Sequence, residues 1–284
     1  MAEWTVRDRV LSTADRTLIM GVVNVTPDSF SDGGRFLGSD RAIAHGQQLF
    51  ADGADLVDVG GESTRPGAEA VSPAQEIKRI VPVIAGLVGA GIPVSVDTSK
   101  PEVAAVAIAE GALVVNDITA GGHPDMAPLV AQTGSGRILM HTRRTPRTMQ
   151  DEPSYSAVAV EVRDFLDDRA AAVQDAGAER SRICIDPGIG FGKTQHHNLQ
   201  LLARLDLLVA TGYPVLVGTS RKSFLGKILD EPDPVERDVA TAATVAIAAA
   251  RGAAVVRVHN VAMARQAVLI ADAIVRSIDV EERP

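Results

Sequence analysis

The sequence predicts a single-domain (β/α)8 TIM barrel over residues 1–284, with parallel strands inside and helices outside. Eight short runs rich in Val, Ile and Leu alternate with longer stretches that carry apolar residues at three- and four-residue spacing. No linker divides the chain, and its 284 residues suit a barrel of this class, which typically has about 250 residues. A doubly wound open sheet is the runner-up, and the count of eight units favours the barrel.

The predicted strands are nearly continuous apolar runs, the pattern of a parallel strand that is covered on both faces. They are Leu18–Val25, Asp55–Val59, Ile92–Asp97, Ala112–Asn116, Arg137–Met140, Arg182–Asp186, Tyr213–Gly218 and Ala253–Val258. Residues 1–16 form an extension before the first strand. We expect this extension to close the bottom of the barrel or to form a small hairpin.

The predicted helices follow the strands one by one. They are Asp40–Asp52, Pro73–Gly89, Pro101–Glu110, Asp125–Gln132, Tyr155–Ala176, His196–Thr211, Pro234–Arg251 and Ala262–Ile278. Glycines stand near the helix-to-strand junctions, where a helix end favours a residue that tolerates positive φ: Gly53, Gly91, Gly111, Gly134, Gly177, Gly212 and Gly252. We expect Asp40, Ser72 and Ser99 to act as N-caps.

The charge balance limits the class of partner. The net charge is −8 at pH 7, which argues against nucleic acid or an anionic membrane surface as the main partner. A small anionic ligand stays possible, because a local cluster of cations can oppose the overall sign. The longest uncharged apolar stretch, Val239–Ala250, is shorter than the roughly 20 residues of a membrane span. The N-terminus lacks the apolar segment of a signal peptide, so we expect a cytoplasmic protein with Cys184 buried as a small apolar residue.

Polar or ionisable residues end all eight predicted strands. They are Asn24, Asp58, Asp97, Asn116 with Asp117, His141, Asp186, Ser220 with Arg221 and Lys222, and Arg257 with His259. In a barrel of this class the chemistry sits at the carboxyl ends of the strands. Carboxylates gathered at the rim of an aliphatic cavity therefore predict a functional site there.

Four of these side chains suit a flat nitrogen heterocycle. A carboxylate that accepts from a ring N–H and a neighbouring amino group forms a charge-assisted, bidentate pair with a guanidine-like edge, such as that of a pterin or purine. We expect Asp97, Asn116 and Asp186 to converge on the barrel mouth for this purpose. Lys222 can donate to a ring carbonyl or ring nitrogen.

Three others suit a phosphate group. Arg257 and His259 are alternate residues of one predicted strand and project the same way, so we expect a compact cationic patch for a phosphate or diphosphate. Asn24 offers a neutral oxygen, which suits a Mg²⁺ ion held mostly by phosphate oxygens and water.

Three connections are long for a compact domain and are typical of lids or binding loops. Two of them, Thr26–Ser39 and Gly60–Ser72, are rich in Gly and Ser. The third, His141–Ser154, carries several arginines and is either a substrate-contacting loop or a solvated basic loop.

The segments at these strand ends resemble the signature motifs of dihydropteroate synthase. The two longest are Asn24-Val-Thr-Pro-Asp-Ser-Phe-Ser-Asp-Gly-Gly34 and Asp58-Val-Gly-Gly-Glu-Ser-Thr-Arg-Pro-Gly67. Further matches are Ser95-Val-Asp-Thr98, Val115-Asn-Asp117, Leu139-Met-His141, Asp186-Pro-Gly-Ile-Gly-Phe-Gly-Lys193, Gly218-Thr-Ser-Arg-Lys-Ser-Phe-Leu-Gly226 and Arg257-Val-His259. The resemblance runs from about Leu18 to Ala271. It implies that (7,8-dihydropterin-6-yl)methyl diphosphate condenses with 4-aminobenzoate to give dihydropteroate and diphosphate, in an SN1-like reaction with Mg²⁺.

The resemblance also implies roles for individual residues. The pterin is held by Asp97, Asn116, Met140, Asp186, Phe191, Gly218 and Lys222. The diphosphate is bound by Asn24, Thr64, Arg257 and His259, with Asn24 on Mg²⁺, and 4-aminobenzoate by Phe30, Arg65, Pro66 and Ser220. Asp97, Lys222 and Arg257 are the expected catalytic residues. The family resemblance further implies a homodimer formed through late helices and competitive inhibition by sulfonamides.

Two other readings stay open at this point. A pterin-dependent methyltransferase would share the pterin-binding Asp and Asn residues but would have no use for Arg257 and His259. A non-catalytic paralogue would bind the pterin without turnover. A P-loop is disfavoured, because the first glycine of that motif before Gly192-Lys193-Thr194 would fall on Pro187.

Overall fold

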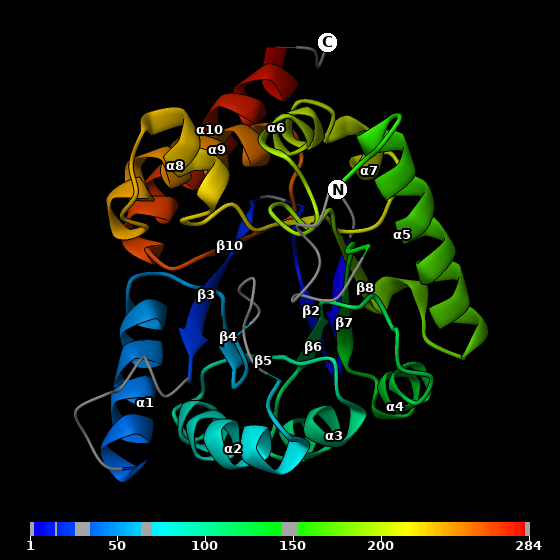
Figure 1. Cartoon of the computed structure of the whole chain (residues 1–284), viewed down its shortest axis with the longest axis vertical. Coiled ribbons are helices and arrows are strands. Elements are labelled where there is room, and N and C mark those ends of the chain that lie inside the picture. Colours follow the sequence, from blue (N-terminus) through cyan, green and yellow to red (C-terminus); the bar gives the residue numbers. More distant parts are fainter. Residues whose placement is uncertain (1–2, 15, 26–34, 64–69, 144–152, 282–284) are drawn as a thin grey trace.

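The computed structural model describes residues 3–14, 16–25, 35–63, 70–143 and 153–281, and it confirms the (β/α)8 barrel (Figure 1). The barrel strands are β3 (Leu18–Asn24), β4 (Leu56–Gly60), β5 (Val94–Asp97), β6 (Val114–Asp117), β7 (Gly136–Met140), β8 (Ile183–Asp186), β9 (Leu216–Val217) and β10 (Val255–Val258). All neighbours pair in parallel, in the order β8-β7-β6-β5-β4-β3-β10-β9. A bridge between Ile185 and Val215 joins β8 to the β9 segment and so closes the ring.

Each predicted strand corresponds to one of these eight. The largest difference is at β9, where only two residues of Tyr213–Gly218 pair as a strand. Pro214 has no N–H for the ladder, and its carbonyl oxygen accepts from Ile185 N–H at 2.9 Å.

The helices lie outside the barrel (Figure 1). They are α1 (Arg35–Ala51), α2 (Pro73–Gly89), α3 (Pro101–Ala109), α4 (Met126–Thr133), α5 (Val158–Asp175), α6 (Gln195–Ala203), α7 (Asp206–Val209), α8 (Ser223–Leu229), α9 (Asp238–Ala250) and α10 (Val261–Glu281). Two 3₁₀ turns, Arg180–Arg182 and Val235–Arg237, precede β8 and α9. Among the described helices, none is both long and apolar enough to cross a membrane.

The helix predictions need three corrections. The stretch His196–Thr211 is two helices, because Arg204 leaves helical geometry at φ −114° and ψ 35°. The sequence reading missed α8 altogether. Of the three expected N-caps only Ser72 is confirmed, with its hydroxyl accepting from Gln75 N–H; Asp40 lies inside α1, and Ser99 precedes the cap residue of α3.

The glycines at the helix-to-strand junctions adopt positive φ, as expected. Gly111 has φ +106°, and a Cβ at this position would lie 2.8 Å from Val88 Cγ1. Both the backbone conformation and the close packing therefore require glycine there.

The N-terminal extension does both things that were expected of it. Strands β1 (Trp4–Val6) and β2 (Arg9–Leu11) form an antiparallel hairpin. Trp4 and Val6 are fully buried and belong to the same apolar cluster as residues from most of the barrel strands, including Leu56 of β4 and Cys184 of β8. The indole N–H of Trp4 donates to the carbonyl oxygen of Arg182 at 3.1 Å, so the hairpin is fixed against the amino ends of the strands.

Strand register sets up the opposite end of the barrel. Asp97 is paired with Asn116 across β5 and β6, and Met140 is paired with Asp186 across β7 and β8. In parallel strands, paired residues point to the same side of the sheet. The register thus brings these side chains into the barrel mouth in neighbouring pairs.

Candidate active site at the carboxyl ends of the barrel strands

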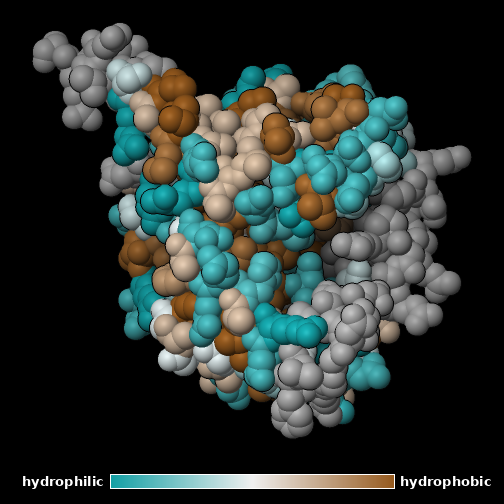
Figure 2. All heavy atoms as spheres, turned by 90° about the vertical axis from the view of Figure 1, so that its left-hand side faces the viewer, coloured by the Kyte–Doolittle hydropathy of each residue, from teal (hydrophilic) through white to brown (hydrophobic). Residues whose placement is uncertain are grey.

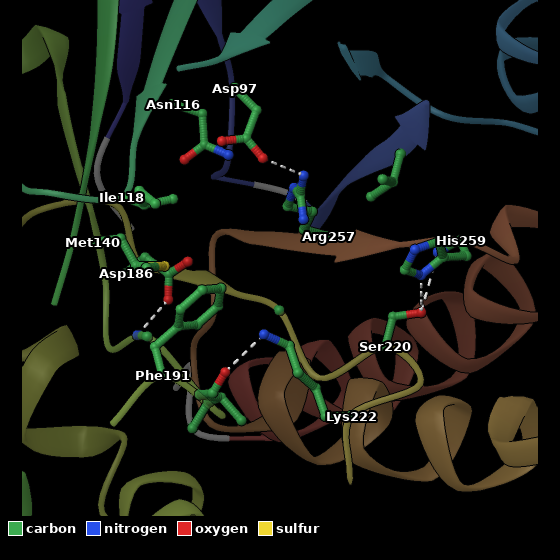
Figure 3. A pocket seen from close by; sticks show the side chains of 14 residues that line it. Asp97, Asn116, Ile118, Met140, Asp186, Phe191, Ser220, Lys222, Arg257 and His259 are labelled. Atoms are coloured by element: carbon green, nitrogen blue, oxygen red, sulfur yellow. Dashed lines mark hydrogen bonds and ion pairs between the residues drawn. The ribbon is translucent and has the colours of Figure 1, made fainter. Parts of the chain in front are cut away.

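One pocket opens among the carboxyl ends of the barrel strands (Figure 3). Its lining residues are Val22, Asp97, Asn116, Ile118, Met140, Asp186, Gly188, Ile189, Phe191, Gly218, Ser220, Lys222, Arg257 and His259. The acids expected at the third and sixth strand tips therefore share a pocket with the bases expected at the seventh and eighth. The sequence interpretation depended on these acidic and basic side chains lying in one pocket, and they do.

The guanidinium of Arg257 links two carboxylates. Its Nε lies 2.7 Å from Asp58 Oδ2, and one terminal nitrogen lies 2.8 Å from Asp97 Oδ2. Asp58 is fully buried and also accepts from the Asn116 side-chain amide at 2.9 Å. Burial works against the charged guanidinium, but Asp58 and Asp97 outweigh it and raise the pKa of Arg257. The sequence reading named Asp58 as a strand end and gave it no role, because its partners come from distant strands.

The Asp97 carboxyl group has a strongly shifted pKa. Burial raises its pKa to about 7; Arg257 opposes the shift, and Asp58 adds to it by like-charge repulsion. The side chain therefore changes charge near neutral pH instead of near 4.

Asp186 and Lys222 form the opposite wall of the pocket. Asp186 Oδ1 accepts from Gly188 N–H at 2.7 Å, and burial raises the pKa of its carboxyl group. Lys222 Nζ donates to the carbonyl oxygen of Ile189 at 2.8 Å and lies 4.1 Å from the centre of the Phe191 ring. Burial lowers the pKa of Lys222 to about 8, although Asp186 favours its charged form.

Ser220 and His259 hold each other in one arrangement. The backbone N–H of His259 donates to Ser220 Oγ at 3.1 Å, and Ser220 Oγ lies 2.9 Å from His259 Nδ1. Burial, followed by Arg257, lowers the pKa of His259 to about 3. Arg257 and His259 thus lie together as expected, but burial disfavours a charge on His259, so Arg257 is the main cation of the expected patch.

The turn that presents Ser220 and Lys222 is clamped to α9. Arg221 between them has φ +59°, an uncommon conformation for a residue other than glycine. Its guanidinium forms a two-pronged ion pair with Asp238, at 2.8 and 2.9 Å. Asp238 also accepts from the Asn260 side chain at 3.0 Å. This clamp compensates for the strained turn and fixes it next to the end of β10.

The remaining predicted residues fall into two groups. Asn24 ends β3, where it is exposed and outside the pocket lining, whereas Met140, Phe191 and Gly218 lie in the lining. Phe30, Thr64, Arg65 and Pro66 lie outside the described residues. The sequence reading missed the apolar wall residues Val22, Ile118 and Ile189. The two-residue period of a strand would have found Ile118, which follows Asn116 by two positions.

A small ion-pair cluster holds both ends of the second long loop. Lys100 Nζ pairs with Glu62 at 2.6 Å and with the buried Glu76 of α2. The other oxygen of Glu62 accepts from Val71 N–H at 2.8 Å. The described ends of this loop, at Glu62 and Val71, are thereby held near Lys100, which follows β5.

Three comparisons with known proteins agree with this geometry. A model of the family described as "Pterin binding enzyme" matches residues 20–259. The dihydropteroate synthase of Mycobacterium leprae (strain TN) is 49% identical over 251 residues, covering 86% of this chain and 88% of that protein. The chain belongs to the dihydropteroate synthase family.

Solved dihydropteroate synthases have the same fold. The Xanthomonas albilineans dihydropteroate synthase with 4-aminobenzoic acid has a TM-score of 0.89 and 43% identity, covering 99% of each chain. The Yersinia pestis dihydropteroate synthase in a sulfonamide drug complex has a TM-score of 0.90 and 40% identity, covering 97% of this chain and 99% of that one. The protein is a transferase of this family, which decides against the pterin-dependent methyltransferase.

Replacing Asp58 tests the buried contacts that join Asp58 to Arg257 and Asn116. Asp58→Asn keeps the shape but removes the charge opposite Arg257, and it places an amide donor where Oδ1 has no partner among the described residues. We expect a loss of stability of about 2 kcal/mol, the usual cost of an unsatisfied buried group, and a large fall in kcat/KM. Urea denaturation and steady-state kinetics measure both.

The exposed Asp206, which pairs with Arg204, supplies the control. Asp206→Asn should change stability by less than about 1 kcal/mol, because surface ion pairs contribute little. If Asp58→Asn unfolds at the same urea concentration as the parent and keeps the parent kcat/KM, the contacts of Asp58 with Arg257 and Asn116 are needed neither for stability nor for activity.

Proposed function

We propose that this pocket condenses (7,8-dihydropterin-6-yl)methyl diphosphate with 4-aminobenzoate, releasing diphosphate and forming dihydropteroate. The observation that carries the proposal is that Asp97, Asn116, Asp186, Lys222 and Arg257 line a single pocket. These groups supply acceptors for a guanidine-like ring edge and a cation for a diphosphate within reach of one small substrate.

The pterin ring would lie between the β6 and β8 ends and Lys222. Because the Asn116 nitrogen donates to Asp58, its amide oxygen is left to accept from a pterin N–H. The Asp186 carboxylate would accept two N–H groups of the aminopyrimidine edge, and Lys222 would donate to a ring acceptor. The Phe191 ring, with Met140, would cover the apolar faces of the heterocycle.

The leaving diphosphate would bind at the end of β10. The Arg257 guanidinium provides the charge, and the neutral His259 provides an Nε2–H donor. We expect the diphosphate to compete with Asp97 for Arg257, because both are anions that bind one guanidinium. Charge that develops on the leaving oxygen is then stabilised by donors already in place.

With the diphosphate at Arg257, Asp97 would be the carboxylate beside the reacting carbon, because it lies 2.8 Å from that guanidinium. We propose an SN1-like reaction: the bond between the methylene carbon and the diphosphate oxygen breaks first, with its electron pair leaving on diphosphate. The amine nitrogen of 4-aminobenzoate then bonds to the carbon and loses a proton. The Asp97 carboxylate, released from Arg257, would stabilise the intermediate cation, while the enclosed pocket limits capture by water.

Mg²⁺ fits the donors at the edge of this site. The described residues contain no group of three His, Cys, Asp or Glu side chains that could hold a metal ion by themselves. Asn24 is exposed at the end of β3, and its amide makes no hydrogen bond to another described residue. It would supply one neutral oxygen to a Mg²⁺ ion held mainly by diphosphate oxygens and water. When bound, the ion would help to neutralise the leaving diphosphate.

The second substrate would enter from the loop side of the pocket. We propose that Ser220, with Phe30, Arg65 and Pro66, binds 4-aminobenzoate, and that Thr64 contacts the diphosphate. The support from the described residues is that Ser220 lines the pocket and that the Lys100–Glu62 pair anchors the loop containing Thr64, Arg65 and Pro66. Sulfonamides share the shape of 4-aminobenzoate and would compete with it.

Diphosphate release tests the function directly. With both substrates and Mg²⁺, the purified protein should release diphosphate, and excess sulfonamide should suppress that release. Asp97→Asn and Lys222→Ala should lower the rate at least about 100-fold, because each removes a charge that contacts substrate, while circular dichroism stays that of the parent. The exposed Lys227→Ala on α8 is the matched control and should be fully active. Pterin binding by the parent without diphosphate release would instead identify a non-catalytic paralogue.

The pKa shifts predict a bell-shaped pH profile. Asp97 must be ionised, and its pKa of about 7 removes the anion as pH falls below 7. Lys222 must be protonated, and its pKa of about 8 removes the cation as pH rises above 8. We expect kcat/KM, which reports groups of the free enzyme, to be highest between pH 7 and 8 and to fall about tenfold per unit well outside it. A flat profile from pH 5.5 to 9.5 in folded protein would refute these assignments.

We propose that the protein is a homodimer formed through α9 and α10. Large apolar side chains are exposed on both helices: Val239 at 72%, Ile270 at 65% and Ile274 at 58%. Figure 2 shows brown and tan side chains over the upper part of this face, where Figure 1 places α8, α9 and α10. A second copy would cover this surface, as apolar patches of this kind mark protein interfaces.

Light scattering after gel filtration tests the dimer. The parent should have about twice the monomer mass of 29.7 kDa, and Ile270→Asp should shift it toward the monomer. Val10→Asp, on an exposed strand of the N-terminal hairpin, is the control and should leave the mass unchanged. A monomeric parent at micromolar concentration would contradict the proposal.

We also propose a cytoplasmic location. Cys184 is unpaired and fully buried, and burial raises the pKa of its thiol well above the usual range. A protein with a single reduced cysteine suits a reducing compartment. Finding the native protein in the membrane or periplasmic fraction of cells would overturn this assignment.

A further inference from the structure

Lys193 belongs to a motif that the proposed reaction leaves unused. Its segment, Gly192-Lys193-Thr194, ends like a phosphate-binding loop, yet the side chain is only 4% exposed. Lys193 Nζ lies 2.9 Å from the carbonyl oxygens of both Gly188 and Phe191. It also lies 2.9 Å from Nδ1 of His141, at the end of β7.

Together with the carbonyl oxygen of His141 at 3.4 Å, these acceptors provide partners for all three N–H bonds of an ammonium group. His141 is buried, and burial followed by the charge of Lys193 lowers the pKa of the imidazole to about 2. Its Nδ1 is therefore an acceptor that Lys193 can use. Burial also lowers the pKa of Lys193 to about 7, against the attraction of Asp186. Lys193 Nζ is enclosed by hydrogen-bond acceptors, and these contacts hold the side chain in place.

The backbone that Lys193 binds forms one wall of the pocket. Gly188 and Phe191 both line it, and Gly188 N–H donates to Asp186 Oδ1. Gly188 has φ +66°, and a Cβ there would lie 2.0 Å from the carbonyl oxygen of His141. The loop therefore needs glycine to approach β7 this closely. Glycine allows many other conformations, so an additional contact is needed to select this one.

We propose that Lys193 is a positioning residue for pterin binding. Its buried ammonium ties the loop after β8 to the end of β7, and thereby places the Phe191 ring and the Asp186 carboxylate against the heterocycle. This inference rests on the proposed binding of the pterin in the pocket and adds a residue that does not itself touch the substrate.

Lys193→Met tests the inference, because methionine keeps most of the volume and removes all three N–H donors. We expect the Kd for the pterin diphosphate, measured by calorimetry without 4-aminobenzoate, to rise about tenfold or more, as loss of a buried charged hydrogen bond predicts. The KM for 4-aminobenzoate at saturating pterin should stay within about twofold of the parent value. If circular dichroism shows Lys193→Met unfolded, Lys193→Gln, which keeps two N–H donors, replaces it.

Tyr155→Phe is the matched control. The Tyr155 hydroxyl donates to the carbonyl oxygen of Gly192 at 2.9 Å, so this variant also removes a hydrogen bond to the loop after β8. Unlike Gly188 and Phe191, Gly192 does not line the pocket. Its pterin Kd should stay within about twofold of the parent value. An equal weakening in both variants would mean that general loop stability matters and would overturn the inference.

A double-mutant cycle with Phe191→Leu separates positioning from a diffuse structural effect. If Lys193 acts through Phe191, the Lys193→Met effect on pterin Kd should shrink at least about threefold in the Phe191→Leu background. Additive effects, or an unchanged pterin Kd in Lys193→Met, would overturn the proposal. A parent that binds pterin but releases no diphosphate would contradict the proposed function alone, since the pterin Kd would still decide the role of Lys193.

Discussion

The ion pairs of Arg257 with Asp58 and Asp97 connect the parts of this site. Arg257 is on β10, Asp58 on β4 and Asp97 on β5, and Asp58 also binds Asn116 on β6. One guanidinium therefore fixes side chains from four strands. A buried carboxylate of this kind is tolerated only with a partner, since an unpaired charge in the interior is very unfavourable. The site consequently depends on all four strands having the correct register.

This arrangement leaves more negative than positive charge around Arg257. Burial and like-charge repulsion raise the pKa of Asp97, which places its titration near neutral pH. In the proposed reaction, a diphosphate would bring further negative charge, and it would compete with Asp97 for Arg257 or bind together with a cation. The proposed Mg²⁺ ion and the release of Asp97 are two consequences of the same electrostatic balance. Burial, followed by the charge of Arg257, lowers the pKa of His259, so in the proposed reaction it would act as a neutral donor.

The sequence predicted the barrel well because its strands are covered on both faces. Runs such as Leu18–Asn24 and Ile183–Asp186 contain no polar side chain until a polar residue marks the strand end, and that change could be read from the chain. Helix ends were harder to predict. Asp40 is a good capping residue by type, yet α1 begins five residues earlier, and α8 is too short to show a clear period.

The network within the site could not be predicted in the same way. His259 contacts Ser220, 39 residues away, and Asp58 contacts Arg257, 199 residues away. Sequence reasoning identified which residues end the strands, but not which ones share a proton or a charge. Lys193 shows the same limit, because its short motif gave it no specific role in the sequence analysis and the structure places it among buried carbonyl groups.

A crystal structure with the pterin diphosphate bound tests the central claim most directly. The account predicts the aminopyrimidine edge within hydrogen-bond distance, about 3 Å, of Asp186 and the Asn116 oxygen, with a diphosphate oxygen at Arg257 in place of Asp97. A pterin bound elsewhere, or an Arg257 still paired to Asp97 with no diphosphate contact, would contradict it.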